Sequence, residues 1–242
     1  MTVTSNERSV IVNADDFGRS HGINRGVVAA HEHGIVTSTS LMVCWPASRD
    51  AAWYARDLPR LDIGLHLDLA EWVYESGTWR PCYERVDLSV AQAVRDEAWW
   101  QIDRFDQLVG SLPSHIDSHQ HVHLSEPARS VVLDIGTELG TVVRGEHPAI
   151  AHRGDFYGQS GTGVPNPGAL GPEALIRLID SLRSGITEIG CHPAEGDESG
   201  SSYSHERDVE RQTLCDPAVR EELDRRGIIL TSFQEVGVPV GT

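Results

Sequence analysis

The amino-acid sequence predicts a single α/β domain in which parallel strands are covered by helices, as either a barrel or an open sheet. The chain has 242 residues, a length that suits one large domain better than two small ones. Strand-like and helix-like segments alternate along most of it, which is the order of repeated β-α units. The most informative polar residues come where predicted strands end, and in parallel folds those ends build the active site.

The first strand and the first helix have clear limits in the sequence. Residues 9–13 are a β-branched run that leads directly to Asp15 and Asp16, which predicts a buried strand with two acids at its carboxyl end. The apolar spacing in 21–33 predicts a helix, and Gly34 is its stop signal.

The later elements repeat this order. Residues 62–69 alternate like a strand that places His66 near its end, and the preceding helix, 47–57, ends before Pro59. Residues 88–110 form the longest helical pattern. The other expected elements are strands at 36–43, 115–119, 141–144, 187–191 and 228–230 and helices at 127–139, 172–183 and 217–226. Since the chain contains neither an internal repeat nor a linker, we predict that residues 1–242 form one domain.

The composition excludes several classes of function. The 36 acidic and 20 basic residues give a net charge of −16, so we expect neither nucleic-acid nor membrane binding. Lysine is absent, which excludes Schiff-base chemistry and a lysine phosphate loop. The cysteines form no CxxC pair, which argues against thiolate zinc and a disulfide framework. Residues 1–8 lack the apolar core of a secretory signal, and no apolar run could span a bilayer, so we predict a cytoplasmic protein.

Five polar residues at predicted strand ends could meet in one cleft: Asp15, Asp16, His66, His119 and His192. One carboxylate and two imidazoles can bind zinc or a similar divalent ion and leave positions for water and substrate. Such an ion acidifies water and polarises a carbonyl, as amide hydrolysis requires. A second acid can accept a proton and a further histidine can donate one, so the five residues supply every role.

Each of these residues also has a simpler interpretation. Adjacent acids such as Asp15 and Asp16 often cap a helix, although the predicted helix begins several residues later. His66 could be a hydrogen-bonded core histidine, and His192 precedes a proline and could shape a turn. Residues 115–123 hold four histidines, largely at alternate positions, which a strand would project to one face, so not all need bind metal. Together, the simpler interpretations require five independent coincidences.

The segments that carry these residues resemble the YdjC-like carbohydrate deacetylases, which include chitooligosaccharide deacetylases. The matching segments, in the family's order, are VNADDFG at 12–18, GIVTSTS at 34–40, GLH at 64–66, PSHIDSHQHVH at 113–123 and CHP at 191–193. The resemblance covers most of the chain, and the pairing of NADDFG with DSHQHVH is specific.

The resemblance implies a distorted (β/α) barrel of mostly parallel strands, similar to polysaccharide deacetylases, with the active site at the strand ends. It assigns Asp16, His66 and His119 to one divalent ion, Zn or Mg, and two imidazoles favour zinc. It makes Asp15 the general base and His192 the general acid or transition-state stabiliser, and the two aspartate roles are the easiest to exchange. It further implies an N-acetylated sugar as substrate, acetate as product and a homodimer.

Substrate contacts are expected from residues outside this set. Residues 154–171 are rich in Gly and Pro around Phe156 and Tyr157, which resembles a family loop and suits stacking on a sugar. Arg144, at another strand end, is a weaker candidate and could equally be a salt-bridged structural residue. Residues 196–205 form a second polar, Gly/Ser-rich stretch, either an active-site loop or a plain surface loop. Gln120 stands where many relatives carry histidine, and on a strand it would point away from the site.

Two other functions compete with deacetylation. A metallohydrolase that acts on another ester or on phosphate substrates would show several cationic groups at the strand ends, where Arg144 is the clear candidate. A non-catalytic sugar-binding relative would lack the base, a metal ligand or the acid, and the sequence contains a candidate for each.

Overall fold

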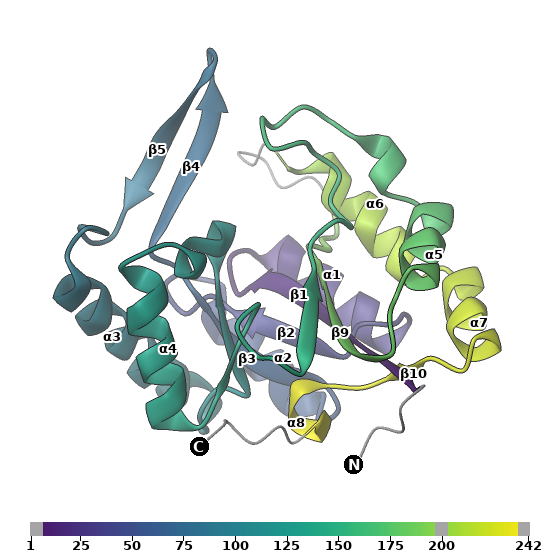
Figure 1. The fold of residues 1–242 in the computed structure, drawn as a ribbon, viewed down its shortest axis with the longest axis horizontal. Coiled ribbons are helices and arrows are strands. Elements are labelled where there is room, and N and C mark those ends of the chain that lie inside the picture. Colours follow the sequence, from purple (N-terminus) through teal and green to yellow (C-terminus); the bar gives the residue numbers. More distant parts are fainter. Residues whose placement is uncertain (1–6, 197–202, 237–242) are drawn as a thin grey trace.

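The central sheet of the described residues has eight strands, and each pairing within it is parallel. The computed structural model describes residues 7–196 and 203–236. The strands are β1 (Arg8–Phe17), β2 (Ser38–Leu41), β3 (Asp62–Leu67), β6 (His115–Ser118), β7 (Val142–Val143), β8 (Ile150–Arg153), β9 (Gly185–Cys191) and β10 (Ile229–Leu230). Their order is β7-β6-β3-β2-β1-β9-β8, with β10 beside the first part of β1 (Figure 1).

The sheet is curled, so that its two edges face a common interior. Arg144, directly after the edge strand β7, bonds Asp15 on β1 and Glu188 on β9, which a flat sheet of this order would keep far apart. Among the described residues no strand pairing joins β7 to β8, so the barrel is not closed. The predicted distorted barrel of mostly parallel strands is confirmed, in the form of a curled half-barrel whose edges stay unpaired with each other among the described residues.

Helices cover the outer face of this sheet (Figure 1). They are α1 (His21–Glu32), α2 (Ser48–Asp57), α3 (Ala91–Val109), α4 (Ala128–Leu139), α5 (Pro172–Asp180), α6 (His205–Leu214) and α7 (Pro217–Arg225). The described residues also form α8 (Phe233–Val236), whose Phe233 packs with Ile11 in a small interior cluster, and the short 3-10 helices η1 (His119–Leu124) and η2 (Pro167–Ala169). The Ser20 side chain caps α1 by accepting from the Ile23 N–H, and Gly110 and Gly140 end α3 and α4 in left-handed conformations. None of the helices described is long and apolar enough to cross a bilayer.

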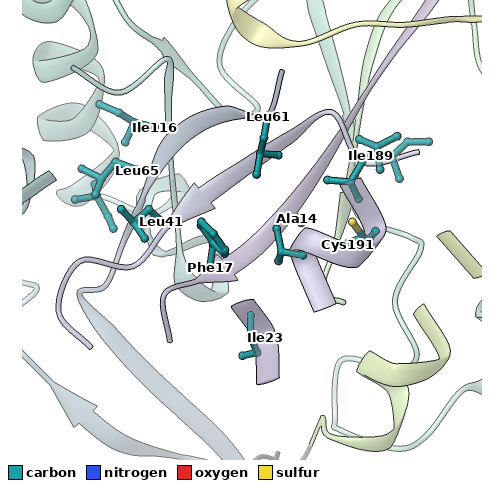
Figure 2. Packing of buried hydrophobic residues seen from close by; sticks show 14 of the residues in the cluster. Ala14, Phe17, Ile23, Leu41, Leu61, Leu65, Ile116, Ile189 and Cys191 are labelled. Carbon is teal, nitrogen blue, oxygen red and sulfur yellow. The ribbon is translucent and has the colours of Figure 1, made fainter. Parts of the chain in front are cut away.

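Alternate residues of β1 face two different environments, as the period of a strand requires. One set packs under the helices in the large core, where Ala14 and Phe17 lie near Leu41 (Figure 2). The other set faces the interior of the sheet, where Ile11 belongs to a small apolar cluster. Asp15 lies on that same face nearer the carboxyl end of β1. The interior is therefore apolar near the amino ends of the strands, which we call the apolar floor, and polar near their carboxyl ends.

A projecting hairpin was not expected from the sequence. β4 (Ala70–Glu75) and β5 (Thr78–Glu84) pair with each other alone and extend away from the body of the protein (Figure 1). Their two-residue turn, Ser76 and Gly77, has positive φ at both positions, which is the usual geometry of a tight hairpin. The strand β8 and the helix α6 were not expected either, and β1 is longer than the expected strand 9–13, because it continues through both aspartates.

The expected strand at 115–119 ends at Ser118, where the chain enters η1. Gln120 and His121 there adopt left-handed conformations, with φ of 49° and 55°. The histidines of this segment therefore do not share one strand face, and that expectation is wrong. His115 stacks on Phe233 near the apolar floor, whereas His119 faces Asp16. The local reason is that the left-handed pair ends the extended backbone after Ser118, so the alternation of a strand no longer applies.

Candidate active site

Asp16, His66 and His119 meet at the carboxyl ends of β1, β3 and β6. Each offers one ligand atom, and these three atoms lie within 4.8 Å of one another. Asp16 Oδ1 lies 3.4 Å from His66 Nε2 and 3.1 Å from His119 Nδ1, and all three residues are buried. A carboxylate with two imidazoles is a donor set that fits a divalent ion such as zinc.

A break in the strand alternation explains why two consecutive aspartates enter one site. Successive strand residues normally point to opposite faces. Asp16, however, has φ of 67°, and the pairing of β1 with β2 shifts register between Ala14 and Phe17. Asp15 and Asp16 therefore both face the interior. Left-handed backbone at a non-glycine residue is strained, and such strain is concentrated at functional sites.

Asp117 holds His66 in the orientation that a metal ligand needs. His66 Nδ1 donates to Asp117 Oδ1 at 2.7 Å, which leaves Nε2 directed at Asp16. Burial acts to lower the pKa of His66, but the carboxylates of Asp117, Asp16 and Asp15 outweigh it and raise this pKa to about 10. A carboxylate behind a ligating imidazole is the usual support of such a ligand.

His119 is supported from the base of the hairpin. Arg19 Nη1 lies 3.0 Å from His119 Nε2, and Glu71 Oε1 on β4 lies 3.7 Å from the same nitrogen. Arg19 Nη2 also donates to both oxygens of Glu71 at 2.9 Å. Gln120 accepts from the N–H of Trp72 and donates to its carbonyl, at 2.8 Å each. Its side chain therefore links η1 to β4.

Asp15 is held as a carboxylate beside the three candidate ligands. Arg144 donates to its two oxygens at 2.6 and 2.7 Å, and Asn13 donates at 2.9 Å. Burial opposes ionisation, yet Arg144, with His66 and His192, holds the pKa of Asp15 well below its usual range. His192 Nε2 lies 3.9 Å from Asp15 Oδ2, so the two residues face each other.

The structure favours a structural position for Arg144 over a sugar contact. Its side chain is fully buried, and besides Asp15 it donates to Asp117 at 2.8 Å and to Glu188 at 2.6 Å. Of the two alternatives that the sequence leaves open, the salt-bridged one matches these contacts. Asp15, His66 and Asp117 form a second possible metal group, but the Arg144 guanidinium already bonds both of its carboxylates.

His192 follows β9 and is bordered by aromatic rings. Its backbone N–H donates to Glu210 of α6, and its Nδ1 lies 3.8 Å from Glu210 Oε1. The rings of Tyr157 and Tyr203 meet the imidazole edge to face, at centroid distances of 5.3 and 5.8 Å. Tyr157 therefore lies at the site, where a sugar contact was expected. Of the polar, Gly/Ser-rich stretch 196–205, residues 197–202 lie outside the described residues.

Phe156 lies in the large apolar core and is 1% exposed, so the expected stacking on a sugar is not supported for this ring. We expect Phe156→Ala to lower the free energy of unfolding by about 3–5 kcal/mol, as for other buried aromatic rings. Urea unfolding followed by circular dichroism measures this. An unchanged midpoint together with a raised KM would instead assign the ring to substrate.

Several residues of the site have no recognisable pattern in the sequence. Arg207 of α6 donates to Asp16 Oδ2 at 2.5 Å, and with His119 it holds the pKa of Asp16 well below its usual range against the effect of burial. Glu71 and Glu210 likewise come from segments of the sequence that match none of the family motifs. Asp117 could have been found, because it stands two residues before His119 in the histidine-rich segment.

A family model described as YdjC-like protein matches residues 9–225. The chain belongs to the YdjC-like family. It is 35% identical over 249 residues to a carbohydrate deacetylase of Geobacillus stearothermophilus, covering 94% of this chain and 98% of the relative. It is 34% identical over 255 residues to a chitooligosaccharide deacetylase of Serratia marcescens, covering 95% and 100%. The resemblance stated from the sequence is thereby confirmed.

Solved structures agree with this family. A protein of Enterococcus faecalis V583, provisionally described as a cellobiose-phosphate cleavage protein, superposes with a TM-score of 0.79 at 27% identity, covering 96% of this chain and 99% of that one. The Xyl-CE4 domain of a multidomain xylanase, from the hindgut metagenome of Trinervitermes trinervoides, gives 0.59 at 14% identity, covering 98% and 95%. This second likeness concerns the fold alone.

Proposed function

We propose that this YdjC-like protein is a metal-dependent hydrolase that removes the N-acetyl group from an N-acetylated amino sugar or oligosaccharide and releases acetate. The observation that carries the proposal is the three-ligand group of Asp16, His66 and His119 beside Asp15 and His192. Relatives with full-length matches are named carbohydrate and chitooligosaccharide deacetylases, which agrees with this chemistry.

Asp16, His66 and His119 would hold the ion. A divalent ion bound there supplies Lewis-acid chemistry, because it polarises the amide carbonyl and acidifies water. One carboxylate and two imidazoles favour zinc by softness, and magnesium is the alternative that the family resemblance implies. His66 keeps its Nε2 directed at the site through the bond from Nδ1 to Asp117.

Asp15 and His192 would move the protons. Asp15 accepts a proton from the attacking water, and His192 donates one to the departing amine nitrogen, so that water and amide become acetate and a free amino sugar. Arg144 fixes the Asp15 carboxylate with two hydrogen bonds, and Glu210 holds the backbone of His192. Tyr157 forms one wall at His192 and is the candidate for contact with the sugar.

The competing phosphatase chemistry is disfavoured by the charges at the site. Arg144 is bonded to Asp15, Asp117 and Glu188, Arg19 to Glu71 and Arg207 to Asp16. Each of these guanidiniums is already bonded to at least one carboxylate. An anionic phosphate would have to displace these ion pairs, whereas a neutral acetamido sugar would not.

The test is acetate release from a panel of N-acetylated sugars, with phosphate esters as the comparison. The protein is stripped of metal with a chelator and then resupplied with zinc or magnesium. We expect acetate from at least one sugar, loss of this activity on stripping and its return with one of the ions. Phosphate release without acetate release would contradict the proposal. Homodimer formation and a cytoplasmic location remain predictions, and light scattering measures the first.

A further inference from the structure

Glu210 of α6 is a fully buried carboxylate directly behind the proposed acid, His192. Its two oxygens accept from the backbone N–H of His192 and from the hydroxyl of Tyr203. Burial and the Glu210 carboxylate raise the pKa of Tyr203, so this hydroxyl stays protonated and donates. A carboxyl group whose two oxygens both accept has the hydrogen-bond pattern of the ionised form. Buried charges in proteins are as a rule paired with an opposite charge, because burial removes their hydration.

The positive charge that would balance Glu210 can come from His192. Of the basic side chains in the described part of the chain, that of His192 alone lies within ion-pair distance of Glu210, with Nδ1 3.8 Å from Oε1. Arg207, three residues earlier on α6, is directed instead at Asp16 Oδ2 and at the His192 carbonyl. An imidazolium at His192 would therefore lie between two carboxylates, Glu210 on one side and Asp15 on the other.

His192 Nδ1 is a buried nitrogen without a hydrogen-bond partner among the described residues. Buried polar atoms in native proteins nearly always have partners, and Glu210 Oε1 is an acceptor that faces this one. The 3.8 Å between the two atoms exceeds a hydrogen bond, but catalytic hydrogen bonds are often long in the free enzyme and shorten in the complex with substrate. We therefore expect Nδ1 to carry a proton that Glu210 accepts.

The other ring nitrogen of His192 is directed at the proposed reaction. Nε2 lies 3.9 Å from Asp15 Oδ2, and the His192 side chain is 23% exposed although its Nδ1 is buried. The hydrogen bond that one imidazole nitrogen makes determines the protonation and direction of the other. A bond from Nδ1–H to Glu210 therefore keeps Nε2 on the side of Asp15, where the departing amine needs a proton.

We propose that Glu210 is the positioning residue of the acid: it accepts from the Nδ1–H of His192 and balances the charge of the imidazolium, which presents Nε2–H to the departing amine. The inference rests on the proposed deacetylase function and gives the Glu210 carboxylate a role beyond the backbone of His192. When the C–N bond breaks, its electron pair stays on the nitrogen and takes the proton from Nε2. His192 is left neutral with its Nδ1–H on Glu210, and solvent returns the proton before the next turnover.

The kinetic test compares Glu210→Gln with the wild type, both supplied with zinc, on the disaccharide of N-acetylglucosamine. Glutamine has nearly the same shape as glutamate but carries no charge. We expect kcat to fall about 10–100-fold, part of the about 10²–10⁴-fold that general acid–base catalysis contributes, with KM changed less than about threefold. Zinc affinity, measured by calorimetric titration, should stay at the wild-type value, because Glu210 bonds none of the proposed ligands. General damage to the site would change all three quantities.

Glu222→Gln is the matched control for the loss of a bonded carboxylate. It makes the same change on α7, where Glu222 accepts from Arg225 and Arg226, and it should leave kcat unchanged. A wild-type kcat in Glu210→Gln, with an active wild type, would overturn the inference and leave the deacetylase proposal intact.

A spectroscopic signature tests the same inference without activity. In nitrogen–proton NMR spectra of protein with isotope-labelled histidine, comparison with His192→Gln identifies the signals of the His192 ring. We expect a proton on Nδ1 that exchanges slowly with water in the wild type and rapidly in Glu210→Gln. The wild-type spectrum decides alone if the wild type releases no acetate or if Glu210→Gln does not fold. A slowly exchanging Nδ1 proton there supports the inference, and an Nδ1 without one overturns it.

Discussion

His119→Ala is expected to abolish metal binding and acetate release together. His119 supplies one of three ligand atoms that lie within 4.8 Å of one another, and its removal leaves a two-ligand site. Loss of a residue that hydrogen-bonds a metal ligand lowers metal affinity by about 10–100-fold. Loss of the ligand itself should lower the affinity further. Without the ion, amide hydrolysis loses its Lewis acid, and turnover should fall to background.

Metal content after dialysis, calorimetric zinc titration and acetate release measure these effects on one sample. His123→Ala is the matched control, because it removes another buried imidazole from η1. His123 bonds the Ser118 hydroxyl and the Arg144 carbonyl, so its loss should reduce stability and leave metal bound. Retention of zinc at wild-type affinity in His119→Ala would remove His119 from the ligand set.

The sequence was sufficient to predict most strands of the central sheet and most of its helices, and to predict that the polar residues at the strand ends meet. Both follow from local patterns, because a β-branched run such as 9–13 must be buried and parallel strands place their carboxyl ends together. Asp16, His66 and His119 were thus assigned to one place from their positions at strand ends, and the structure brings them together. Their roles stay predictions.

The sequence was not sufficient to predict the residues that surround this group. Glu71, Arg207 and Glu210 reach the site from the hairpin and α6, and their positions depend on how distant elements pack. Phe156 shows the same limit, because its burial is decided by tertiary packing and not by its Gly-rich neighbours. A strand pattern in the sequence also gives no sign of the left-handed backbone at Asp16, which turns Asp16 to the interior face that Asp15 already occupies.

Asp15→Asn is expected to keep the metal and lose turnover. The amide has nearly the same shape as the carboxylate but cannot accept a proton from water, and general-base catalysis contributes about 10²–10⁴-fold. We therefore expect kcat to fall by about 10³-fold. The fold should persist, because Arg144 retains its bonds to Asp117 and Glu188.

The comparison with Asp16→Asn decides the roles of the two aspartates. Asp16 Oδ1 faces both His66 Nε2 and His119 Nδ1, whereas the oxygens of Asp15 are taken by Arg144. Asp16→Asn should therefore lose metal, and Asp15→Asn should bind it with near wild-type affinity. Metal content and kcat measured on both variants separate the cases. If Asp15→Asn loses the ion while Asp16→Asn retains it, the two roles are exchanged, and the Arg144 contact marks a ligand instead of a base.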